Sequence, residues 1–509
     1  MKTKTIIEKK LHKKLSNTNT LVYDMMESLL GEDNDREKQR FLSPKQRPDG
    51  RYVTSEATLD RSIDPRIFRE TQLKRICLWL TTKPPLLKVF FNWLFVKKMK
   101  MKLDYFSEGE HYNPNNIYKA GENHQIEDDV SNNFKIHNLG HATQLIQTEG
   151  LNILTDPVFG NLAPVVYPSM TKKFGWDIQP SNLPRIDVVL ISHNHRDHVD
   201  EASLKAIVKN GQQPTLFVPK GDKTYFEKIG FETVSEFKWH EEASIRSVLT
   251  GKQVSICSVP ADHRSGRYGY DAHKSLVSGW VISPKFRDEI LYFAGDTARL
   301  DDTRLLSLAL DIYALYQHKK INLDHQCALP KIISMVPGGP NYTRKDMKPT
   351  HQSAVDSVII AFRLALALEE VSKKDGHTVA ADNWLNATAT VFMHHNRFQL
   401  GPDRFNENVF IYNRMHSYLE MDDKVLNEHL SKQQTKSMAW SLFHRRKDFI
   451  IDGVKELKIL AERIWPNVSS EERKYQLIQL IKPRTHFPLI NEKLTSTHAF
   501  MFNRNVVQA

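Results

Sequence analysis

One short loop of the sequence gathers four side chains that can bind metal ions. Residues 192–200 read Ser-His-Asn-His-Arg-Asp-His-Val-Asp, which places His193, His195, Asp197 and His198 within six residues. The apolar run at 187–191 just before them is typical of a buried strand that ends where the loop begins. Four such side chains can converge only from a tight loop, which is how a protein usually presents a metal site.

This donor set predicts the kind of ion. Imidazole nitrogens and carboxylate oxygens are the ligands that zinc and similar divalent ions prefer. Alternate residues of an extended or turning segment can face two adjacent ions, so one loop could supply two metals. The alternative is a surface loop that is rich in histidine by chance, which 22 histidines in 509 residues allow. The spacing favours the metal site.

Four further segments match a known family in the order that the family has them. They are 139–160, which begins Leu-Gly-His-Ala-Thr; 260–263, Pro-Ala-Asp-His; 292–297, Tyr-Phe-Ala-Gly-Asp-Thr; and 389–394, an apolar strand pattern ending in histidine. With the His-x-His-x-Asp-His loop they resemble the metallo-β-lactamase superfamily of binuclear metallohydrolases over residues 134–413. Within it, the chain looks most like the phospholipases D that hydrolyse N-acylphosphatidylethanolamine, whose metal loop also carries Ser-His-Asn-His.

The resemblance implies two divalent metal ions, with Zn²⁺ preferred because histidine-rich sites with carboxylates suit it. The implied ligands are His193, His195 and His263 for the first ion, Asp197, His198 and His394 for the second, and Asp296 as the bridge between them. The last ligand stays open between His394 and His395, because His395 and Asn396 stand where the family usually has Trp-Gly. We favour His394.

Two adjacent cations imply hydrolysis. Paired ions lower the pKa of bound water towards neutrality and stabilise both the attacking and the leaving oxygen of a displacement. Asp296 would keep the ions paired, and Asp197 could add general-base character that ligation would reduce. The expected reaction is cleavage of a phosphodiester in a phospholipid, which gives phosphatidic acid and an N-acylethanolamine.

Three further residues are candidates for substrate contact. Arg196 stands where the resembled phospholipases usually have Tyr, and it could pair bidentately with a phosphate or simply salt-bridge the loop. Lys348 falls where that family has a histidine, and His351 follows three residues later; both are candidates for phosphate contact or protonation of the leaving group. Gln352 and Ser353 replace the acidic pair of the family at this point, which puts the exact substrate in doubt.

Other functions stay open at this stage because one fold hosts many chemistries. A hydrolase of the same fold could act on a soluble ester, a lactone or a cyclic phosphate. Net charge would suit a nuclease, but no nuclease motif is found, so a nucleic acid partner is disfavoured. The alternative without catalysis is a scaffold that keeps metal for stability and binds a partner through its added helices.

Charge and cysteine content limit the environment. Lysine and arginine number 71 against 60 acidic residues, which gives a net charge of +11 and a pI near 9.2, so anionic partners are expected. The three cysteines have no paired spacing, which argues against a disulfide framework and for a reducing compartment. The polar, basic start of the chain does not read as a secretory signal, so a cytoplasmic location is expected.

One apolar stretch suggests a membrane surface. Residues 86–96 are rich in Leu, Phe and Trp but too short to span a bilayer, and a cluster of lysines follows at 97–102. This combination fits a helix in the interface of an anionic membrane, and hence peripheral attachment. The alternative is a helix packed on the core or closing a homodimer.

The fold class follows from the order of the elements. A length of 509 residues and 40% hydrophobic content predict more than one structural unit with a buried core. Residues 1–110 are expected to be basic and mostly helical, and 111–413 to form an α/β hydrolase domain, the αββα metallo-β-lactamase sandwich. Residues 414–509 are expected to form an added helical module that ends its main helical run before Pro466.

Overall fold

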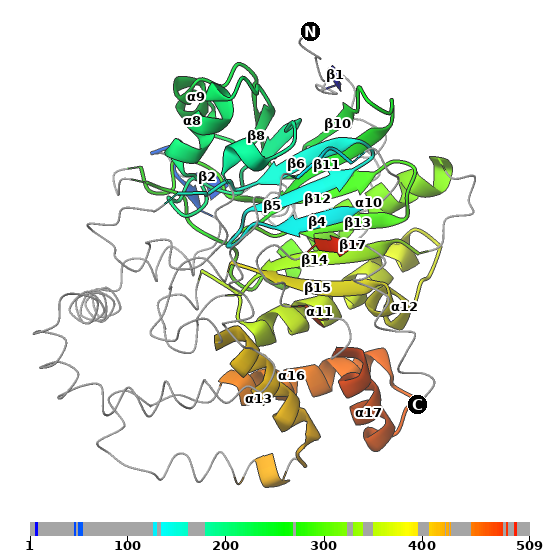
Figure 1. The fold of residues 1–509 in the computed structure, drawn as a ribbon. Helices are drawn as coiled ribbons and strands as arrows, with labels where there is room; N and C mark the ends of the chain where they lie inside the picture. Colours follow the sequence, from blue (N-terminus) through cyan, green and yellow to red (C-terminus); the bar gives the residue numbers. More distant parts are fainter. Residues whose placement is uncertain are drawn as a thin grey trace, which may run out of the picture.

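Two β-sheets packed face to face form the centre of the computed structural model (Figure 1). The described residues are 6–8, 45–46, 49–53, 126–129, 134–160, 179–267, 271–322, 329–338, 350–394, 407–422, 424–426, 428, 449–481, 485–486 and 493–495. Helices cover the outer face of each sheet, so that the layers run helix, sheet, sheet, helix. The predicted αββα sandwich is confirmed.

The first sheet changes from antiparallel to parallel along its width. Its order is β17 (Lys493–Thr495), β4 (Lys135–Asn138), β5 (Gln144–Thr148), β6 (Leu151–Thr155), β7 (Val188–Leu190), β8 (Thr215–Pro219) and β9 (Val234–Phe237). The strands from β17 to β6 pair antiparallel, and those from β6 to β9 pair parallel. Of the three crossovers that these parallel pairs require, the helices α8 (Glu201–Lys209) and α9 (Lys223–Ile229) make those from β7 to β8 and from β8 to β9. A 3-10 turn, η3 (Pro180–Asn182), precedes β7.

The second sheet repeats this plan. Its order is β1 (Ile6–Glu8), β10 (Glu242–Arg246), β11 (Gln253–Pro260), β12 (Ser278–Pro284), β13 (Glu289–Phe293), β14 (Lys331–Pro337), β15 (Thr388–Met393) and β16 (Thr485–His486). Pairing is antiparallel as far as β13 and parallel beyond it. The crossover helices are α10 (Asp302–Asn322), α11 (Ala354–Lys374) and α12 (Ala381–Asn386). A separate hairpin joins β2 (Lys45–Gln46) and β3 (Tyr52–Val53).

The two sheets are held in register by a buried apolar layer and by one polar link. Strand residues such as Ile153 and Val188 of the first sheet share a fully buried cluster with Ile256 and Trp280 of the second. The indole Nε1 of Trp280 donates a hydrogen bond of 3.0 Å to the carbonyl of Ile191, at the end of β7. This bond ties the start of the histidine-rich loop to the opposite sheet.

Parallel strands deliver their loops to one edge of the sandwich. In the first sheet β6 and β7 run parallel and end together, and in the second sheet β13, β14 and β15 do the same. Strand β11 is antiparallel to β12, which is antiparallel to β13, so β11 also ends at this edge. Loops that are far apart in the sequence therefore meet there, as the carboxyl ends of strands do at the ligand sites of α/β folds.

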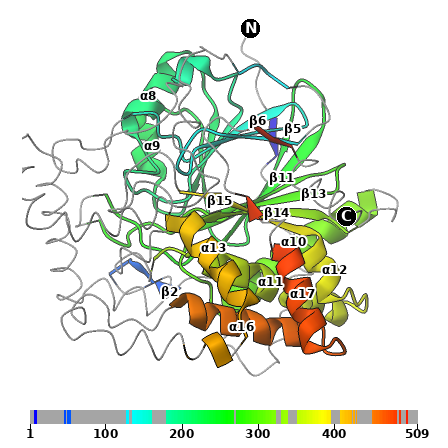
Figure 2. The same cartoon turned by 60° about the horizontal axis from the view of Figure 1, so that its bottom comes forward.

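Segments from the C-terminal part of the chain complete the sandwich. Helices α13 (Glu407–Glu420), α16 (Phe449–Ile464) and α17 (Ser470–Ile481) form a further layer against α11, and Figure 2 shows them beyond the helices that cover the second sheet. Strands β16 and β17 come from the same C-terminal part and extend both sheets. The expected boundary between 413 and 414 falls inside α13.

Of residues 1–110, which were expected to be mostly helical, the structure describes 6–8, 45–46 and 49–53, which contain β1, β2 and β3. The apolar segment 86–96 and the lysine cluster at 97–102 lie outside the described residues. Among the helices that are described, none combines the length and the apolar character needed to cross a bilayer.

We expect Gly453→Ala to loosen the contact between α16 and α11. A Cβ on Gly453 would lie 2.2 Å from Cγ1 of Val355, so the two helices must move apart. Overpacking of this kind costs about 1–3 kcal/mol, which exceeds the roughly 1 kcal/mol that alanine gains over glycine in a helix. Chemical denaturation should therefore show a lower free energy of unfolding. Ile459→Ala, at an exposed position on the same helix, is the control.

The double variant Gly453→Ala with Val355→Ala tests the contact itself. Removing the valine methyl groups makes room for the new Cβ, so the two substitutions should be less destabilising together than the sum of their separate effects. Additive effects would show that this contact does not limit the packing of α16.

Candidate metal centre

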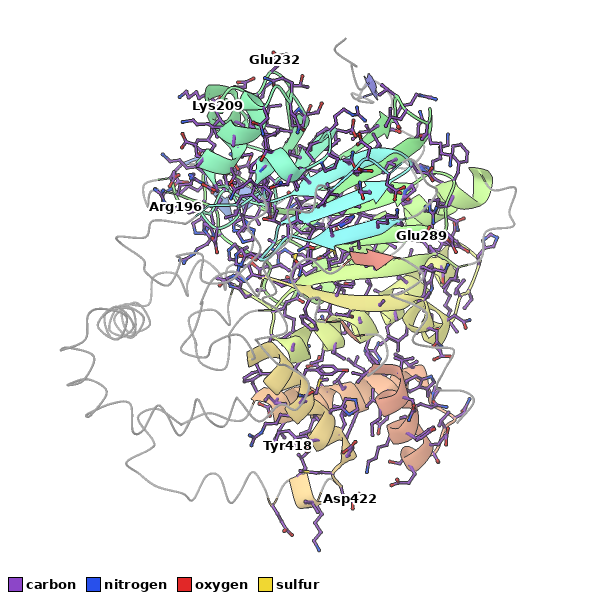
Figure 3. The ribbon with its side chains drawn as sticks, viewed as in Figure 1. Arg196, Lys209, Glu232, Glu289, Tyr418 and Asp422 are labelled. Carbon is purple, nitrogen blue, oxygen red and sulfur yellow. The ribbon has the colours of Figure 1, made fainter. Side chains whose placement is uncertain are left out.

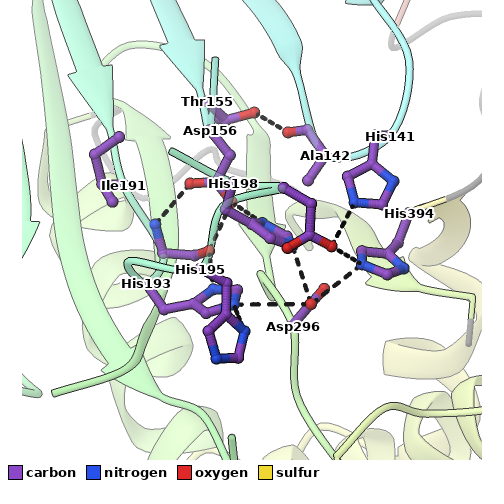
Figure 4. Close-up of polar contacts among 12 residues, drawn as sticks. His141, Ala142, Thr155, Asp156, Ile191, His193, His195, His198, Asp296 and His394 are labelled. Carbon is purple, nitrogen blue, oxygen red and sulfur yellow. Dashed lines mark hydrogen bonds and ion pairs between the residues drawn. The ribbon is translucent and has the colours of Figure 1, made fainter. Parts of the chain in front are cut away.

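The seven predicted ligands come together at the edge where the strands end. Figure 4 shows five of them, His193, His195, His198, Asp296 and His394. Four of them, His193, His195, Asp197 and His198, lie in the loop between β7 and α8, and the side chain of Asp200 ends this loop by capping α8. The other three each follow a strand of the second sheet: His263 after β11, Asp296 after β13 and His394 after β15. Each sheet thus supplies part of the site.

A glycine allows the two principal loops to approach each other. Gly295 has φ +60°, and a Cβ there would lie 2.4 Å from Cβ of Ser192. Any larger residue would separate the loop of Asp296 from the loop of His193. In the Gly-Asp pair of the sequence, Gly295 therefore allows the close approach of the loops and Asp296 supplies the metal-binding carboxylate.

The first group of donors consists of three imidazoles. Nδ1 of His195 lies 2.9 Å from Nε2 of His193 and 3.2 Å from Nε2 of His263. Ligand atoms around a tetrahedral zinc ion with bonds of about 2.0–2.1 Å lie about 3.3 Å apart. The spacing of the three nitrogens therefore matches that of ligands around one ion.

The second group contains a residue that the sequence reasoning missed. His141, Asp197, His198 and His394 each place one ligand atom so that all four lie within 4.8 Å of one another. Oδ2 of Asp197 lies 3.3 Å from Nε2 of His141 and 3.7 Å from Nε2 of His394. His141 belongs to the Leu-Gly-His-Ala-Thr segment on which the resemblance partly rests, but nothing in its spacing from the loop indicates that it lies here.

Asp296 stands between the two groups, as a bridging residue must. Its Oδ2 atom lies 2.9–3.1 Å from the Nε2 atoms of His198, His351 and His394. The same oxygen lies 3.8 and 3.9 Å from Nε2 of His193 and His263 in the first group. One carboxylate oxygen therefore faces imidazoles of both groups.

A buried aspartate fixes the protonation of two loop histidines. Oδ2 of Asp156 accepts hydrogen bonds from Oγ of Ser192, at 2.6 Å, and from Nδ1 of His198, at 2.7 Å. Because Ser192 donates its proton to Asp156, its Oγ accepts from Nδ1 of His193, 2.9 Å away. Both histidines thus carry their proton on Nδ1 and turn an Nε2 lone pair towards the site. Support of this kind commonly sets the tautomer of metal-binding histidines.

His263 is fixed in the same way from the other sheet. Its Nδ1 lies 2.8 Å from the carbonyl oxygen of Thr350, which can only accept, so Nδ1 carries the proton and Nε2 presents a lone pair. Residue 350 lies just before α11, next to His351, whose Nδ1 is 2.9 Å from Oγ1 of Thr350. The start of α11 therefore orients two imidazoles of the site.

The donor set fits divalent cations. Nε2 of His198, Nε2 of His394 and Oδ1 of Asp296 are buried, and within the described part of the chain they make no hydrogen bond of good geometry. Buried polar atoms are normally hydrogen-bonded, and unsatisfied ones are costly. Divalent cations would satisfy these atoms together with the three nitrogens of the first group. Imidazole and carboxylate donors in this arrangement suit zinc, and other divalent metals of similar preference fit the same atoms.

Two histidines of the second group, His198 and His394, differ from the three of the first group in their affinity for protons. Burial, with the nearby guanidinium of Arg264, lowers the pKa of His195 to about 3. Burial and neighbouring imidazoles also lower the pKa values of His193 and His263 well below the usual range. Burial is the largest single effect on His198 and His394 and lowers their pKa values, but the neighbouring carboxylates together outweigh it. Asp296 with Asp156 raises the pKa of His198, and Asp296 with Asp197 raises that of His394.

Several other residues of the predicted site can be placed. His351 is buried and faces Asp296, as already described, whereas Arg196 is half-exposed at the end of the sandwich where the loop lies (Figure 3). Lys348 and His395 lie outside the described residues. The structure thus brings His351 to the ligands and leaves Arg196 at their margin.

The two positions that depart from the family pattern have structural roles here. The backbone N–H of Gln352 donates to the carbonyl of Thr297, next to Asp296, at 2.9 Å. Ser353 caps α11 in a capping box with Asp356. These contacts connect the start of α11 to the Asp296 loop.

Comparison with known proteins agrees with this geometry. Residues 151–316 match the Beta-lactamase superfamily domain. Two curated relatives are the N-acyl-phosphatidylethanolamine-hydrolyzing phospholipase D 1 of Caenorhabditis elegans, 34% identical over 169 residues, and the mitochondrial enzyme of the same description from Saccharomyces cerevisiae, 31% identical over 181 residues. The matches cover 32% and 35% of this chain, and 46% and 37% of the relatives. The chain thus spans less than half of the length of either relative.

Two solved structures are also similar. One is the isothiocyanate hydrolase from Delia radicum gut bacteria, with a TM-score of 0.37 and 16% identity. The match covers 71% of this chain and 98% of the hydrolase. The other is a metallo hydrolase of the archaeon Ignicoccus hospitalis, with a TM-score of 0.35 and 19% identity. The match covers 55% of this chain and 89% of the archaeal protein.

We expect the two ions to leave at different pH values. A histidine with a raised pKa is protonated near neutrality in the metal-free protein, so an ion must displace its proton and binds less tightly as the pH falls. His198 and His394 are in this class, whereas the pKa values of the first group are lowered, that of His195 to about 3, which delays proton competition to lower pH. Dialysis over a series of falling pH values, followed by metal analysis, should show loss of one ion first. Simultaneous loss of both would contradict this assignment.

We expect Asp156→Asn to weaken metal binding about 10- to 100-fold, as is typical when a partner that orients ligands is lost. The amide can no longer accept from both Ser192 and His198 through a charged oxygen, so the tautomers are no longer fixed. Competition with a chromophoric chelator measures the change. Asp187→Asn is the matched control, because Asp187 is also buried but bonds to Asn152 and Arg185 away from the ligands. Equal losses in both variants would point to a general folding defect.

Proposed function

We propose that this chain, which belongs to the metallo-β-lactamase superfamily, is a metal-dependent hydrolase that cleaves a phosphodiester of an N-acylphosphatidylethanolamine-like phospholipid. The observation that carries the proposal is the convergence of seven predicted ligands into two adjacent groups that share Asp296. The two curated phospholipase D relatives supply the substrate class. Expected products are phosphatidic acid and an N-acylethanolamine.

Each donor group would bind one of two divalent ions, for which Zn²⁺ is the most suitable. His193, His195 and His263 would hold one, Asp197, His198 and His394 the other, and Asp296 would bind both. When bound, such a pair lowers the pKa of water towards neutrality and stabilises charge on the attacking and leaving oxygens. Asp197 is a candidate general base, with basicity reduced by its role as a ligand.

Cationic side chains beside the ligands would attract the phosphate group. Arg264 follows His263 directly, is exposed, and lies near enough to His195 to lower its pKa. Arg196 is half-exposed within the metal loop. A guanidinium can contact two phosphate oxygens at once, so both arginines are suited to hold the substrate against the ligands. Lys348 is a further candidate for this contact.

His351 is suited to protonate the leaving oxygen. Its Nε2 lies 2.9 Å from Oδ2 of Asp296, the oxygen that also faces the imidazoles of both groups. Burial lowers the pKa of His351, so its imidazole is largely neutral near pH 7 and would first accept the proton that the attacking water releases. Donation to the departing N-acylethanolamine oxygen would avoid release of a free alkoxide.

The proposal is tested with purified protein of known metal content and mixed phospholipid vesicles that contain N-acylphosphatidylethanolamine, with mass spectrometry of the products. The wild type should release phosphatidic acid and N-acylethanolamine. Asp296→Asn should reduce the rate at least about 100-fold, since loss of a ligand costs no less than loss of its support. Asp311→Asn, a buried position on α10 that contacts His240, is the control and should retain activity.

Absence of lipid products from a protein that holds two ions would exclude the phospholipid substrate. The same preparation would then be offered soluble esters, lactones, cyclic phosphates and nucleic acid. Cleavage of one of these, abolished by Asp296→Asn, would keep the metal-dependent hydrolase and reassign its substrate.

A further inference from the structure

His141 was not among the predicted ligands, yet it is buried beside them with an unusual backbone conformation. It lies in the tight turn between β4 and β5, is 1% exposed, and has φ +57°. Few non-glycine residues adopt this left-handed conformation, and buried strain of this kind clusters at functional sites. The turn therefore holds the imidazole of His141 among the candidate ligands at the cost of backbone strain.

The strained turn is joined directly to the last predicted ligand. The backbone N–H of His394 donates a hydrogen bond of 2.9 Å to the carbonyl of His141, and His394 itself has φ +65°. The two imidazole rings lie with centroids 4.0 Å apart. Because His141 belongs to the first sheet and His394 to the second, this bond closes the site across the two sheets. It fixes the position of one ring relative to the other.

The side chain of His141 points at the carboxylate that the second ion would use. Its Nε2 is 3.3 Å from Oδ2 of Asp197, which equals the spacing expected between two ligands of one tetrahedral zinc ion. The ligand atoms of His141, Asp197, His198 and His394 lie within 4.8 Å of one another. Three imidazoles and one carboxylate are a sufficient set of four.

We infer that His141 is a further nitrogen ligand of the ion that Asp197, His198 and His394 hold. The second ion then has four protein ligands without the shared Asp296, whereas the first group has three imidazoles and depends on Asp296 or solvent for its fourth ligand. The inference rests on the proposed metal centre and does not depend on which substrate the enzyme cleaves. A hydrogen bond that merely orients Asp197 is the competing role for His141.

The test isolates the second ion and measures its binding with Co²⁺. His195→Ala leaves the first group with two nitrogens, so in this background one Co²⁺ should bind tightly, with the absorption bands of a nitrogen-rich site. Adding His141→Ala should weaken this ion at least about 100-fold and change the bands, because a ligand is lost rather than an outer partner, whose loss costs about 10- to 100-fold. His137→Ala, on β4 four residues away, is the matched control and should bind like the background.

A second variant separates ligation from orientation. Glutamine at this position can still donate a hydrogen bond to Asp197 but is a poor substitute for an imidazole ligand. His141→Gln should therefore lose the ion much as His141→Ala does, and its circular dichroism and thermal unfolding show whether the fold is retained. Co²⁺ affinity and absorption bands that match the background in His141→Gln would overturn the inference in favour of orientation. Unchanged binding in His141→Ala would overturn it outright. Neither readout requires lipid hydrolysis, so failure of the proposed substrate would leave this result intact.

Discussion

The structure depends on a cluster of buried nitrogen and carboxylate atoms at the junction of the two sheets. Seven predicted ligands and His141 direct nitrogen and carboxylate atoms at one another over distances of about 3 to 4 Å, largely away from water. Such an arrangement is unfavourable without positive charge between the groups, because buried polar atoms need partners and buried charges need compensation. Divalent cations provide that charge, and much of the surrounding architecture holds the donors in place for them.

That support comes from both sheets and from outside them. Asp156 at the end of β6 fixes the tautomers of the loop histidines, and Thr350 before α11 does the same for His263. Trp280 ties the second sheet to the strand that leads into the loop. On the outer layer, Arg299 lies close to Asp356 of α11 and forms an ion pair with Glu456 of α16. These last pairs are partly exposed, so each contributes little stability by itself, but they join the C-terminal helices to the segment that follows Asp296.

The chemistry of the site is better defined than its substrate. Two donor groups that share one carboxylate are suited to hydrolysis in general, since paired ions act on any ester-like bond placed between them. The phosphodiester assignment rests on the relatives and on cationic residues at the margin, chiefly Arg264 and Arg196. At the start of α11, the backbone of Gln352 bonds to that of Thr297 and Ser353 caps the helix.

The amino-acid sequence was enough to predict the fold class and those candidate ligands that are close together in the chain. His193, His195, Asp197 and His198 could be predicted because a single turn constrains their directions, and the alternation of strands and helices predicted the layers. The roles of His141 and Asp156 were decided only by tertiary structure. Each lies more than 35 residues from the loop that it contacts, and its role depends on how the strand ends meet, which no local spacing encodes. The same reason explains why the C-terminal part, expected to be a separate helical module, supplies strands to both sheets: edge pairing depends on where the chain returns in space.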